Sequence, residues 1–499
     1  MHSAADWVGG SRGKALACAL CAALLLCVGW LLFWRLGEMH IVDYDEARHG
    51  VSAYEMLRSG DYLVHTYQGE PDYWNLKPPL SFWSIALSYR IFGFNAFALR
   101  FYSALSALLA AIALTVWVWR NCGCWAALLP PLVFAANAGI YANHFARFGD
   151  ADAQYQLFFT LAMLCMLASG RGFGWLYGSA LFFGLAFLDK GTHAATIPAV
   201  CLFYMLCTGR LKELSWKRIL LLALAGAAFV VPWLAARYLR DGTAFFEGML
   251  ATDVADRLNA AAVASDLNTP ALLYYLKMLF RFPAMAVCLA LCVLSAAILP
   301  SGRAKLGRAR RDALIGCALW FALPIALYSL TGAKFSWYVY SGLMSMPVLT
   351  ALLLSSAYSG GAWKSGLCVL TGVAVVCFGL FAIQNAFKIT PISFSHTTQE
   401  FLRESLDRDI DAEKHAYIQY AAAEGENGRP KTEWMQADVL TALYCGDVVC
   451  KDGGIEAFRK DEEYAILFVV RQGNEDSVNP LLEEYPVRNE GYYLLAFDN

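Results

Sequence analysis

Long apolar segments dominate this chain and limit what it can fold into. The first runs from Ala15 to Trp34, which is too long for the core of a signal peptide and long enough to cross a bilayer. Hydrophobic residues make up 58% of the chain, and charged residues only 16%. We therefore predict an α-helical, polytopic membrane bundle of about 11 spans. The other ten predicted spans lie near residues 97–119, 124–143, 151–169, 173–188, 192–208, 219–238, 271–300, 312–330, 337–357 and 365–387.

The basic residues of the loops predict an orientation. If the N-terminus is cytoplasmic, the two dense basic clusters at 209–218 and 301–311 both fall in inner loops, as the positive-inside rule expects. The same topology places the loop of about 36–96, including a short apolar helix at 79–93, on the outside of the cytoplasmic membrane. The net charge of −2 gives no reason to expect nucleic acid as a partner.

Beyond residue 389 the composition changes to mixed charge with Gly and Pro. We expect a membrane-embedded domain at 1–388 and a small extracytoplasmic α/β domain at 389–499. Alternating and continuous apolar patterns predict strands at 464–470 and 492–497 and helices at 434–443 and 477–484 in that tail.

Two of the fifteen cysteines, Cys445 and Cys450, lie in the polar tail. In an oxidising compartment a disulfide between them is expected. The others, from Cys18 to Cys377, fall in apolar segments or their short connections, where a thiol behaves as a small hydrophobe.

A charged motif, Asp43-Tyr44-Asp45-Glu46-Ala47-Arg48, follows the first span. Ionisable groups are costly at a bilayer and by default indicate a functional site. A structural alternative is a helix start, in which Asp43 caps the helix, Glu46 closes a capping box and Asp45 faces the helix dipole. For Asp45 we favour a functional role.

Lys77 precedes two prolines in Lys77-Pro78-Pro79-Leu80. Each proline fixes its own backbone and biases the residue before it toward extended geometry, so the lysine is held in place. A snorkelling lysine is the alternative. We favour a phosphate contact, because snorkelling does not need a rigid turn.

Structural roles can also explain the other charged residues of the outer loops. Asp150 could cap the helix that begins near 151, and Lys190-Gly191 matches a helix stop. Lys334, close to Tyr338, could anchor an aromatic belt. Jointly, however, the charges describe a cavity in which cations suit a lipid-linked phosphate and a carboxylate suits deprotonation of a hydroxyl. The cations are Lys77, Arg147, Lys190 and Lys334, and the carboxylates are Asp45, Asp150 and Asp152.

At these residues the chain resembles the C-type glycosyltransferases, specifically the bacterial relatives of dolichyl-phosphate-mannose protein mannosyltransferases and of the aminoarabinose transferase that modifies lipid A. The similarity spans roughly residues 40–350. It is carried by the motif at 43–48 and by Tyr54-Glu55-Met56-Leu57-Arg58-Ser59-Gly60-Asp61, Lys77-Pro78-Pro79-Leu80-Ser81-Phe82-Trp83, Phe92-Gly93, Arg100-Phe101-Tyr102-Ser103-Ala104, Ala146-Arg147-Phe148-Gly149-Asp150-Ala151-Asp152, Gly184-Leu185-Ala186-Phe187-Leu188-Asp189-Lys190-Gly191 and Lys334-Phe335-Ser336-Trp337-Tyr338.

The resemblance implies a multispanning fold and a lipid-phosphate-sugar donor. It also implies that Asp45 is the catalytic carboxylate, Lys77 the phosphate-contacting lysine and Asp152 the acidic residue of the second loop. Leu76 stands where the aminoarabinose branch has a glutamate implicated in zinc binding. This departure argues against zinc and against lipid A as acceptor, and leaves a magnesium or manganese ion near Asp45 and Glu46 as the metal alternative.

We therefore predict an inverting glycosyltransferase that moves one sugar from a polyprenyl-phosphate donor to a hydroxyl of a glycan, lipid or protein at the outer face of the membrane. The alternatives are a ligase for lipid-linked glycans and a secondary transporter or flippase. A transporter would concentrate its charges near the bilayer midplane and show paired halves, whereas these charges lie at the outer edge. The candidate residues are Asp45, Glu46 and Asp152 for catalysis, Lys77, Arg147, Lys190 and Lys334 for the donor phosphate, and Arg48, Asp150 and Tyr338 as further members of the site.

Overall fold

The computed structural model describes residues 10–137, 141, 144–251, 274–275, 277–279, 282–298, 306–331, 334–360, 364–389, 397–421, 431–491 and 494–499. The chain divides into two compact units, each treated by itself below. The membrane unit comprises residues 1–36, 76–81 and 100–391, and the loop-tail unit comprises 37–75, 82–99 and 392–499. The outer loop thus groups with the C-terminal tail. The predicted domains at 1–388 and 389–499 stay a prediction.

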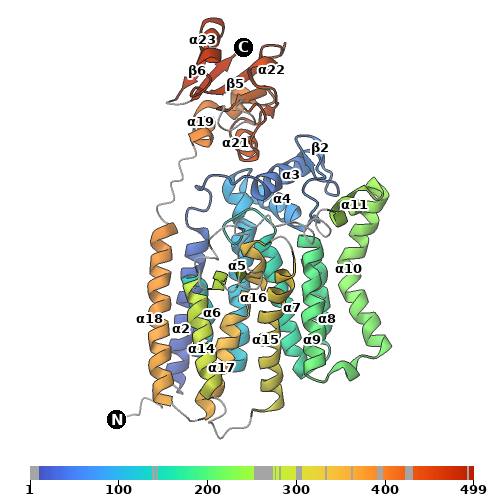
Figure 1. Cartoon of the computed structure of the whole chain (residues 1–499), viewed down its shortest axis with the longest axis vertical. Helices are drawn as coiled ribbons and strands as arrows, with labels where there is room; N and C mark the ends of the chain where they lie inside the picture. The colour runs from blue at the N-terminus through green and yellow to red at the C-terminus, as the bar shows by residue number, and fades with distance from the viewer. Residues whose placement is uncertain are drawn as a thin grey trace. The chain divides into compact units, whose positions relative to one another are not determined.

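Helices form the membrane unit, and each predicted apolar segment contains one of them. Among the described residues, seven helices are long and apolar enough to cross a membrane. This confirms a polytopic membrane protein, whereas the count of eleven spans stays a prediction because four of the helices are shorter. The helices, shown in Figure 1, are α2 (Ser11–Phe33), α5 (Ala96–Cys122), α6 (Leu129–Ala136), α7 (Asp152–Ala168), α8 (Trp175–Lys190), α9 (Thr196–Cys207), α10 (Trp216–Asp241), α11 (Ala244–Leu250), α14 (Pro283–Ile298), α15 (Arg308–Ser329), α16 (Tyr340–Leu343), α17 (Met346–Gly360) and α18 (Lys364–Ile389).

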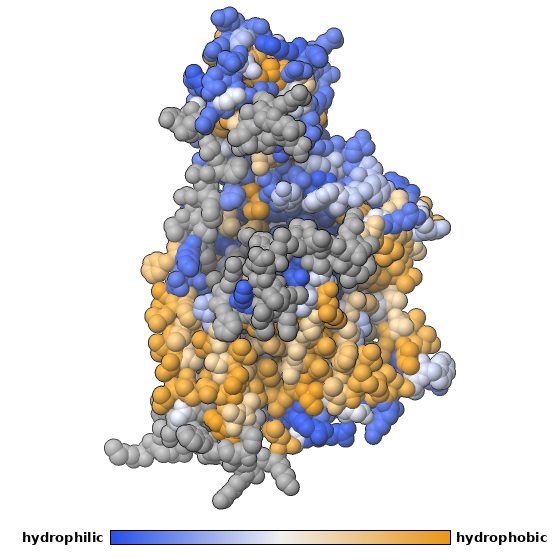
Figure 2. Space-filling model, in the orientation of Figure 1, coloured by the Kyte–Doolittle hydropathy of each residue, from blue (hydrophilic) through white to orange (hydrophobic). Residues whose placement is uncertain are grey.

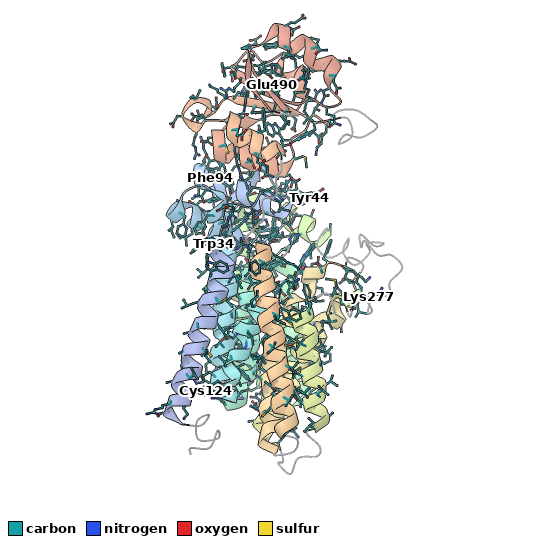
Figure 3. The ribbon with its side chains drawn as sticks, turned by 90° about the vertical axis from the view of Figure 1, so that its left-hand side faces the viewer. Trp34, Tyr44, Phe94, Cys124, Lys277 and Glu490 are labelled. Atoms are coloured by element: carbon teal, nitrogen blue, oxygen red, sulfur yellow. The ribbon has the colours of Figure 1, made fainter. Side chains whose placement is uncertain are left out.

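The surface of these helices is apolar, and one close contact between two of them is made by glycines. Figure 2 shows apolar side chains gathered over the helical part of the molecule, and Figure 3 labels Trp34 and Cys124, which lie at opposite ends of the helices. A Cβ at Gly184 of α8 would lie 2.6 Å from the carbonyl oxygen of Gly226 in α10. Small residues at such crossings let membrane helices approach closely. This close packing stabilises the pair, because lipid chains are as apolar as the side chains and give no hydrophobic drive for association.

The loop-tail unit contains a five-stranded mixed sheet with strand order β4-β3-β5-β7-β6. Its core includes Leu467, Val469, Leu481 and Phe497. Both strands and both helices predicted in the tail are confirmed as β5, β7, α21 and α23. The elements of this unit are α3 (Asp45–Ser59), β1 (Thr66–Tyr67), β2 (Glu70–Pro71), α4 (Leu80–Phe92), α19 (Thr397–Ser405), α20 (Arg408–Asp411), β3 (His415–Gln419), α21 (Gln436–Gly446), β4 (Val449–Cys450), α22 (Gly454–Phe458), β5 (Ala465–Val470), α23 (Glu475–Glu484), β6 (Val487–Glu490) and β7 (Leu494–Asp498).

Hydrogen bonds tie the outer loop to the tail within this unit. Ile41 exchanges two main-chain hydrogen bonds with the side-chain amide of Gln399, at 2.8 and 2.9 Å. The Tyr54 hydroxyl of α3 donates to Asp447 at 2.5 Å, at the end of α21. These contacts explain why residues almost 400 positions apart form one compact unit.

The predicted disulfide is wrong, because both Cys445 and Cys450 are free thiols. Cys445 belongs to the last turn of α21, whereas Cys450 belongs to β4, which pairs with β3. Burial raises the pKa of the Cys445 thiol above its ordinary value. Both residues are accommodated by packing rather than by a covalent bridge.

Candidate active site

The start of α3 presents Asp45 on a strained backbone. Tyr44, immediately before it, has φ +67° and ψ −114°, a conformation that costs a residue with a Cβ about 1–3 kcal/mol. Asp45 is half-buried, and its carbonyl oxygen lies 2.5 Å from Nδ1 of His49. Such strain is typical of functional positions, so it supports the functional interpretation of Asp45.

The structural alternative for this motif is partly wrong. No side chain caps α3. Asp43 instead accepts a hydrogen bond from the Ala437 amide at 2.8 Å, in the first turn of α21. Glu46, which is buried, accepts from the Val42 amide at 2.9 Å and so holds the chain that enters the helix. Glu46 therefore has a structural task, and its catalytic role stays a prediction.

Arg48 fixes the outer loop. Its guanidinium forms a bidentate pair with Asp72, at 2.7 and 3.1 Å, and lies over the rings of Tyr67 and Trp74 at 4.1 and 4.7 Å. Burial favours the neutral acid, but the hydrogen bonds and charge of Arg48 outweigh it and lower the pKa of Asp72. Asp72 also accepts the Asn75 amide at 3.1 Å. Arg48 is thus occupied in holding residues 67–75 against α3.

In the membrane unit, Lys190 and Asp152 form a buried ion pair. Lys190 is the last residue of α8, Asp152 is the first of α7, and the ammonium donates to Asp152 Oδ1. The two side chains are 6% and 3% exposed. The ammonium also lies 5.8 and 5.7 Å from the ring centroids of Tyr155 and Tyr338. The structure therefore brings together three residues that the sequence predicted for the site.

The rigid turn of Lys77 packs beside this pair. A Cβ on Gly191 would lie 3.5 Å from Cδ of Pro78, and Gly191 has φ +58°, which favours glycine. Lys77 is half-buried. The proline after Lys77 therefore lies close to the residue that follows Lys190, and a phosphate contact by Lys77 stays a prediction.

Asp189 is a member of this cluster that the list of candidates missed. Its side chain is fully buried, and within the described residues neither carboxylate oxygen has a hydrogen-bond partner. The charges that act on it are those of Asp152, Lys190, Asp150 and Lys77. Its position next to Lys190 in the sequence was the available signal for a site residue. Successive residues of a helix point in different directions, however, so this position alone did not place Asp189 in the cluster.

Arg147 has a different environment from the one predicted. Its guanidinium is 1% exposed and donates to the carbonyl oxygens of Leu31, Leu32 and Trp34 at 2.9, 3.0 and 2.9 Å. These are carbonyls at the C-terminal end of α2, which lack partners within the helix. Arg147 therefore caps α2, and this geometry does not favour the predicted phosphate contact.

His144, Asp150 and Asp152 offer ligand atoms that all lie within 4.8 Å of one another. Among the described residues this is a group that could hold a metal ion, and a magnesium or manganese ion near Asp45 and Glu46 stays a prediction. His144 Nδ1 lies 2.6 Å from Asp150, and Asp150 accepts the Asp152 amide at 3.2 Å. Asp150 thus supports the first turn of α7. Because the Lys190 ammonium already neutralises Asp152, we derive no step through a metal.

A short helix, η8 (Ser336–Val339), contains Tyr338 and follows Lys334. Tyr338 contacts the rings of His193 and Tyr328, with centroids 5.1 and 4.9 Å away. Lys334 is half-buried just before this helix. The aromatic surroundings are as expected for a membrane-interface belt, and a phosphate contact by Lys334 stays a prediction.

Comparison with known proteins shows what this chain is similar to. Residues 76–235 match the family model described as dolichyl-phosphate-mannose-protein mannosyltransferase. The chain is 30% identical over 329 residues to the undecaprenyl phosphate-alpha-4-amino-4-deoxy-L-arabinose arabinosyl transferase 1 of Pseudomonas fluorescens, a match that covers 61% of this chain and 52% of the relative. It is 29% identical over 345 residues to the corresponding transferase of Pseudomonas aeruginosa, covering 66% and 58%.

The chain thus spans only a little more than half the length of these relatives. Among solved structures, the fold is similar to that of ArnT from Cupriavidus metallidurans bound to undecaprenyl phosphate, with a TM-score of 0.67, 15% identity, and coverage of 99% of this chain and 98% of that one. The predicted resemblance is therefore confirmed, and the chain has the C-type glycosyltransferase fold of the aminoarabinose transferases.

Proposed function

We propose that this protein is an integral-membrane glycosyltransferase that moves a single sugar from an undecaprenyl-type phosphate to a hydroxyl acceptor. The observation that carries the proposal is the buried Asp152–Lys190 pair beside the rigid Lys77 turn. A membrane protein rarely buries so many charges unless they line a ligand path. The relatives named above use an undecaprenyl phosphate-linked sugar.

At the donor, Lys77, Lys190 and Lys334 bind the phosphate. Ammonium groups make charge-assisted hydrogen bonds to phosphate oxygens, and these strengthen as the anomeric C–O bond breaks and charge grows on the phosphate. Lys190 exchanges its Asp152 partner for the phosphate in this step. The products are the glycosylated acceptor and the free lipid phosphate.

At the acceptor, Asp45 takes the proton of the attacking hydroxyl. The hydroxyl oxygen attacks the anomeric carbon from the side opposite the leaving phosphate, so one displacement inverts the configuration. The strained backbone at Tyr44 supports this role, because strain is retained where it positions a reacting group. General-base catalysis of this kind contributes about 10²–10⁴-fold.

The proposed orientation has the N-terminus in the cytoplasm, with the site and the tail outside. The basic clusters at 209–218 and 301–311 then lie inside. A lipid-linked donor suits the outer face, where nucleotide sugars are lacking. A glycan, a lipid and a protein all offer the required hydroxyl.

A lipid-linked glycan ligase is the second candidate, because the same lysines would bind the phosphate of a longer donor. The two are separated by mass spectrometry of polyprenyl phosphates and envelope glycans from cells with the wild-type protein or Asp45→Asn. We expect a single-sugar lipid phosphate to accumulate in the variant while one glycan loses a matching residue.

Accumulation of a lipid-linked oligosaccharide would favour the ligase. Unchanged pools, with the variant confirmed in the membrane, would exclude Asp45 as the base and favour transport. Asp409→Asn is a suitable control for expression, since Asp409 is exposed and lies outside the candidate residues.

A further inference from the structure

A pocket with a volume of about 460 Å³ lies within the loop-tail unit, between α3, the β1–β2 hairpin and the tail. Both β1 and α21 pack against α3, and Figure 1 shows α21 next to that helix. The outer loop lines the pocket with residues of α3 and with the two-residue turn Gln68-Gly69. The tail lines it with Glu413, α21 and β4. The volume is typical of a small-molecule site, for which about 300–1,000 Å³ is usual.

The charged side chains at the mouth of this pocket have partners that a ligand can replace. Arg58 donates to Glu413 at 3.1 Å and to both carboxylate oxygens of Asp447 at 3.2 Å. Arg58 and Glu413 are both exposed. Exposed ion pairs of this kind contribute little to stability, so a ligand hydroxyl can take the place of either partner at little cost.

Glu55 adds a carboxylate that is held in place. It accepts hydrogen bonds from the Thr66 hydroxyl and, at 3.2 Å, from the Gly69 amide. An ionised carboxylate has about four acceptor positions, so two such bonds leave room for ligand hydroxyls. The lining thus carries three carboxylates and one guanidinium. This excess of negative charge disfavours an anionic ligand and suits a neutral or cationic one.

Aliphatic side chains supply most of the remaining surface, among them Val51 of α3 and Val439, Leu443 and Val448 of the tail. This mixture matches a saccharide, whose hydroxyls lie around the edge of the ring and whose C–H groups lie on its faces. Planar carboxylate and guanidinium groups can bind two neighbouring hydroxyls at once. A lipid chain would instead bury these charged groups without replacing their hydrogen bonds.

The backbone of the pocket is strained at several positions. Among the described residues, six that are not glycine have positive φ, and three of these six line this pocket. They are Gln68 at +53°, Glu413 at +68° and Asp447 at +51°. Aspartate tolerates this left-handed conformation, whereas glutamine and glutamate adopt it at a cost. Because such strain persists mainly at active sites and ligand clamps, its concentration here supports a binding function.

The pocket follows α3 toward the proposed base. Its residues on that helix run from Val51 to Arg58, which lie about 9 and about 20 Å along the axis from Asp45. Arg48 precedes Val51 by three positions and therefore lies on the same side of the helix, one turn nearer to Asp45. A single sugar inside the pocket would not reach Asp45, so an acceptor bound there contains several sugar residues.

Exposed aromatic rings occupy the interval between the pocket and Asp45. Tyr44, labelled in Figure 3, and Trp74 are both exposed and stack with their ring centroids 6.3 Å apart. The Arg48 guanidinium lies over Trp74 and also over Tyr67, the residue before Gln68 of the pocket. Aromatic faces are negative and attract the polarised C–H groups of a sugar ring. These rings therefore continue a saccharide-binding surface from the pocket to the base.

We propose that this pocket binds a saccharide of the acceptor, and that the acceptor is a glycan of several residues that is neutral or carries ammonium groups. The inference rests on the proposed function, because it takes Asp45 to be the base at which the glycan ends. Inner residues of the glycan lie in the pocket, the next stack on Trp74 and Tyr44, and the terminal hydroxyl reaches Asp45.

The test narrows the pocket from an exposed position. Val449 of β4 lines the pocket and is 44% exposed, so Val449→Phe adds a ring there without disturbing the core. Val487→Phe is the matched control, because Val487 of β6 is 41% exposed and does not line the pocket. The purified full chains are applied to an array of bacterial envelope oligosaccharides with neutral, ammonium-bearing and anionic members. Dissociation constants for undecaprenyl phosphate are measured in parallel.

We expect the wild type to bind neutral or ammonium-bearing oligosaccharides and Val449→Phe to bind them about tenfold more weakly, with the control unchanged. The affinity for undecaprenyl phosphate should be the same in all three. Binding of no saccharide, binding of anionic members alone, or equal binding by Val449→Phe would overturn the inference, while retained donor affinity would leave the proposed function intact. Wild-type protein that does not bind undecaprenyl phosphate would overturn both.

A second variant tests the path from the pocket to Asp45. Trp74 is exposed, so Trp74→Leu removes its ring without opening the core. The same oligosaccharides should bind this variant about tenfold more weakly, because the glycan loses a stacking surface. Unchanged binding would show that the glycan does not run along these rings, which would overturn the proposed path.

A protein acceptor would present a peptide to the same pocket. Serine-rich and threonine-rich peptides on the same array separate the two cases. Loss of peptide binding in Val449→Phe, with saccharide binding retained, would assign the pocket to a protein acceptor and overturn the inference. Loss of saccharide binding, with no peptide bound by the wild type, supports it.

Discussion

Two buried cations of the membrane unit look alike in the sequence and differ in what holds them. Arg147 donates to three carbonyl oxygens at the end of α2, whereas Lys190 donates to the carboxylate of Asp152. The carbonyls are fixed at the end of the helix. The carboxylate is a counter-charge that a phosphate can replace. Burial alone therefore does not identify a ligand-binding cation, and we propose that the nature of its partner distinguishes the two.

The largest expected effect comes from removing the exchangeable cation. Lys190→Met should lower the affinity for undecaprenyl phosphate about 10²-fold, because a charge-assisted contact is lost. It should also destabilise the fold by about 3–5 kcal/mol, since Asp152 is left buried and uncompensated. Isothermal titration and thermal unfolding in detergent measure the two effects.

The double variant Asp152→Asn/Lys190→Met separates them. It should recover most of the thermal stability and none of the phosphate affinity. If affinity returns together with stability, Lys190 acts only through the fold and the contrast with Arg147 disappears.

Arg147→Lys should show the reverse pattern. A lysine cannot reach three carbonyls at once, and we expect a loss of about 3 kcal/mol in stability, in line with hydrogen bonds from a charged donor. The affinity of the folded protein for undecaprenyl phosphate should stay unchanged. Reduced affinity at unchanged melting temperature would instead restore the phosphate contact predicted from the sequence.

Arg48 extends the comparison to the loop-tail unit. Its counter-charge is the carboxylate of Asp72, as Asp152 is for Lys190, but the Tyr67 ring and a main-chain hydrogen bond to Asp72 also hold this pair in place. Asp72→Asn should destabilise this unit by about 1–3 kcal/mol. The pKa of Asp72 lies below its ordinary value of about 3.9, so its contribution is complete above that pH and is lost as pH falls through the folded pKa.

The difference in melting temperature between wild type and Asp72→Asn should accordingly be constant from pH 7 to pH 5 and shrink toward pH 3. The control is Asp409→Asn. The Asp409 carboxylate is exposed, and it has no such ion pair among the described contacts. A difference that grows as pH falls would contradict the assigned direction of the pKa.

Much of the fold could be predicted, because long apolar segments and alternating strands are local patterns. The glycine at 191, the cap-like position of Asp150 and the tail strands follow from such patterns. The hydrogen bonds of Arg147 to the end of α2 and the grouping of residues 37–75 with the tail could not be predicted, because both depend on partners distant in sequence. Asp43 illustrates this best: its spacing to Glu46 fits a capping box, yet its partner is Ala437.

The smallest expected effect is that of substituting Tyr44. It tests whether the strained backbone at Tyr44 positions Asp45 for catalysis. Glycine normally destabilises relative to alanine by about 1 kcal/mol, but at φ +67° only the residue without a Cβ is relaxed. Tyr44→Gly should therefore be more stable than Tyr44→Ala by about 1 kcal/mol, both having lost the same exposed ring. If strain positions Asp45, the glycine variant should nevertheless transfer more slowly than the alanine variant at equal donor affinity. Equal rates would mean that the strain is a by-product of the loop, and alanine as the more stable variant would mean that this backbone carries no strain at all.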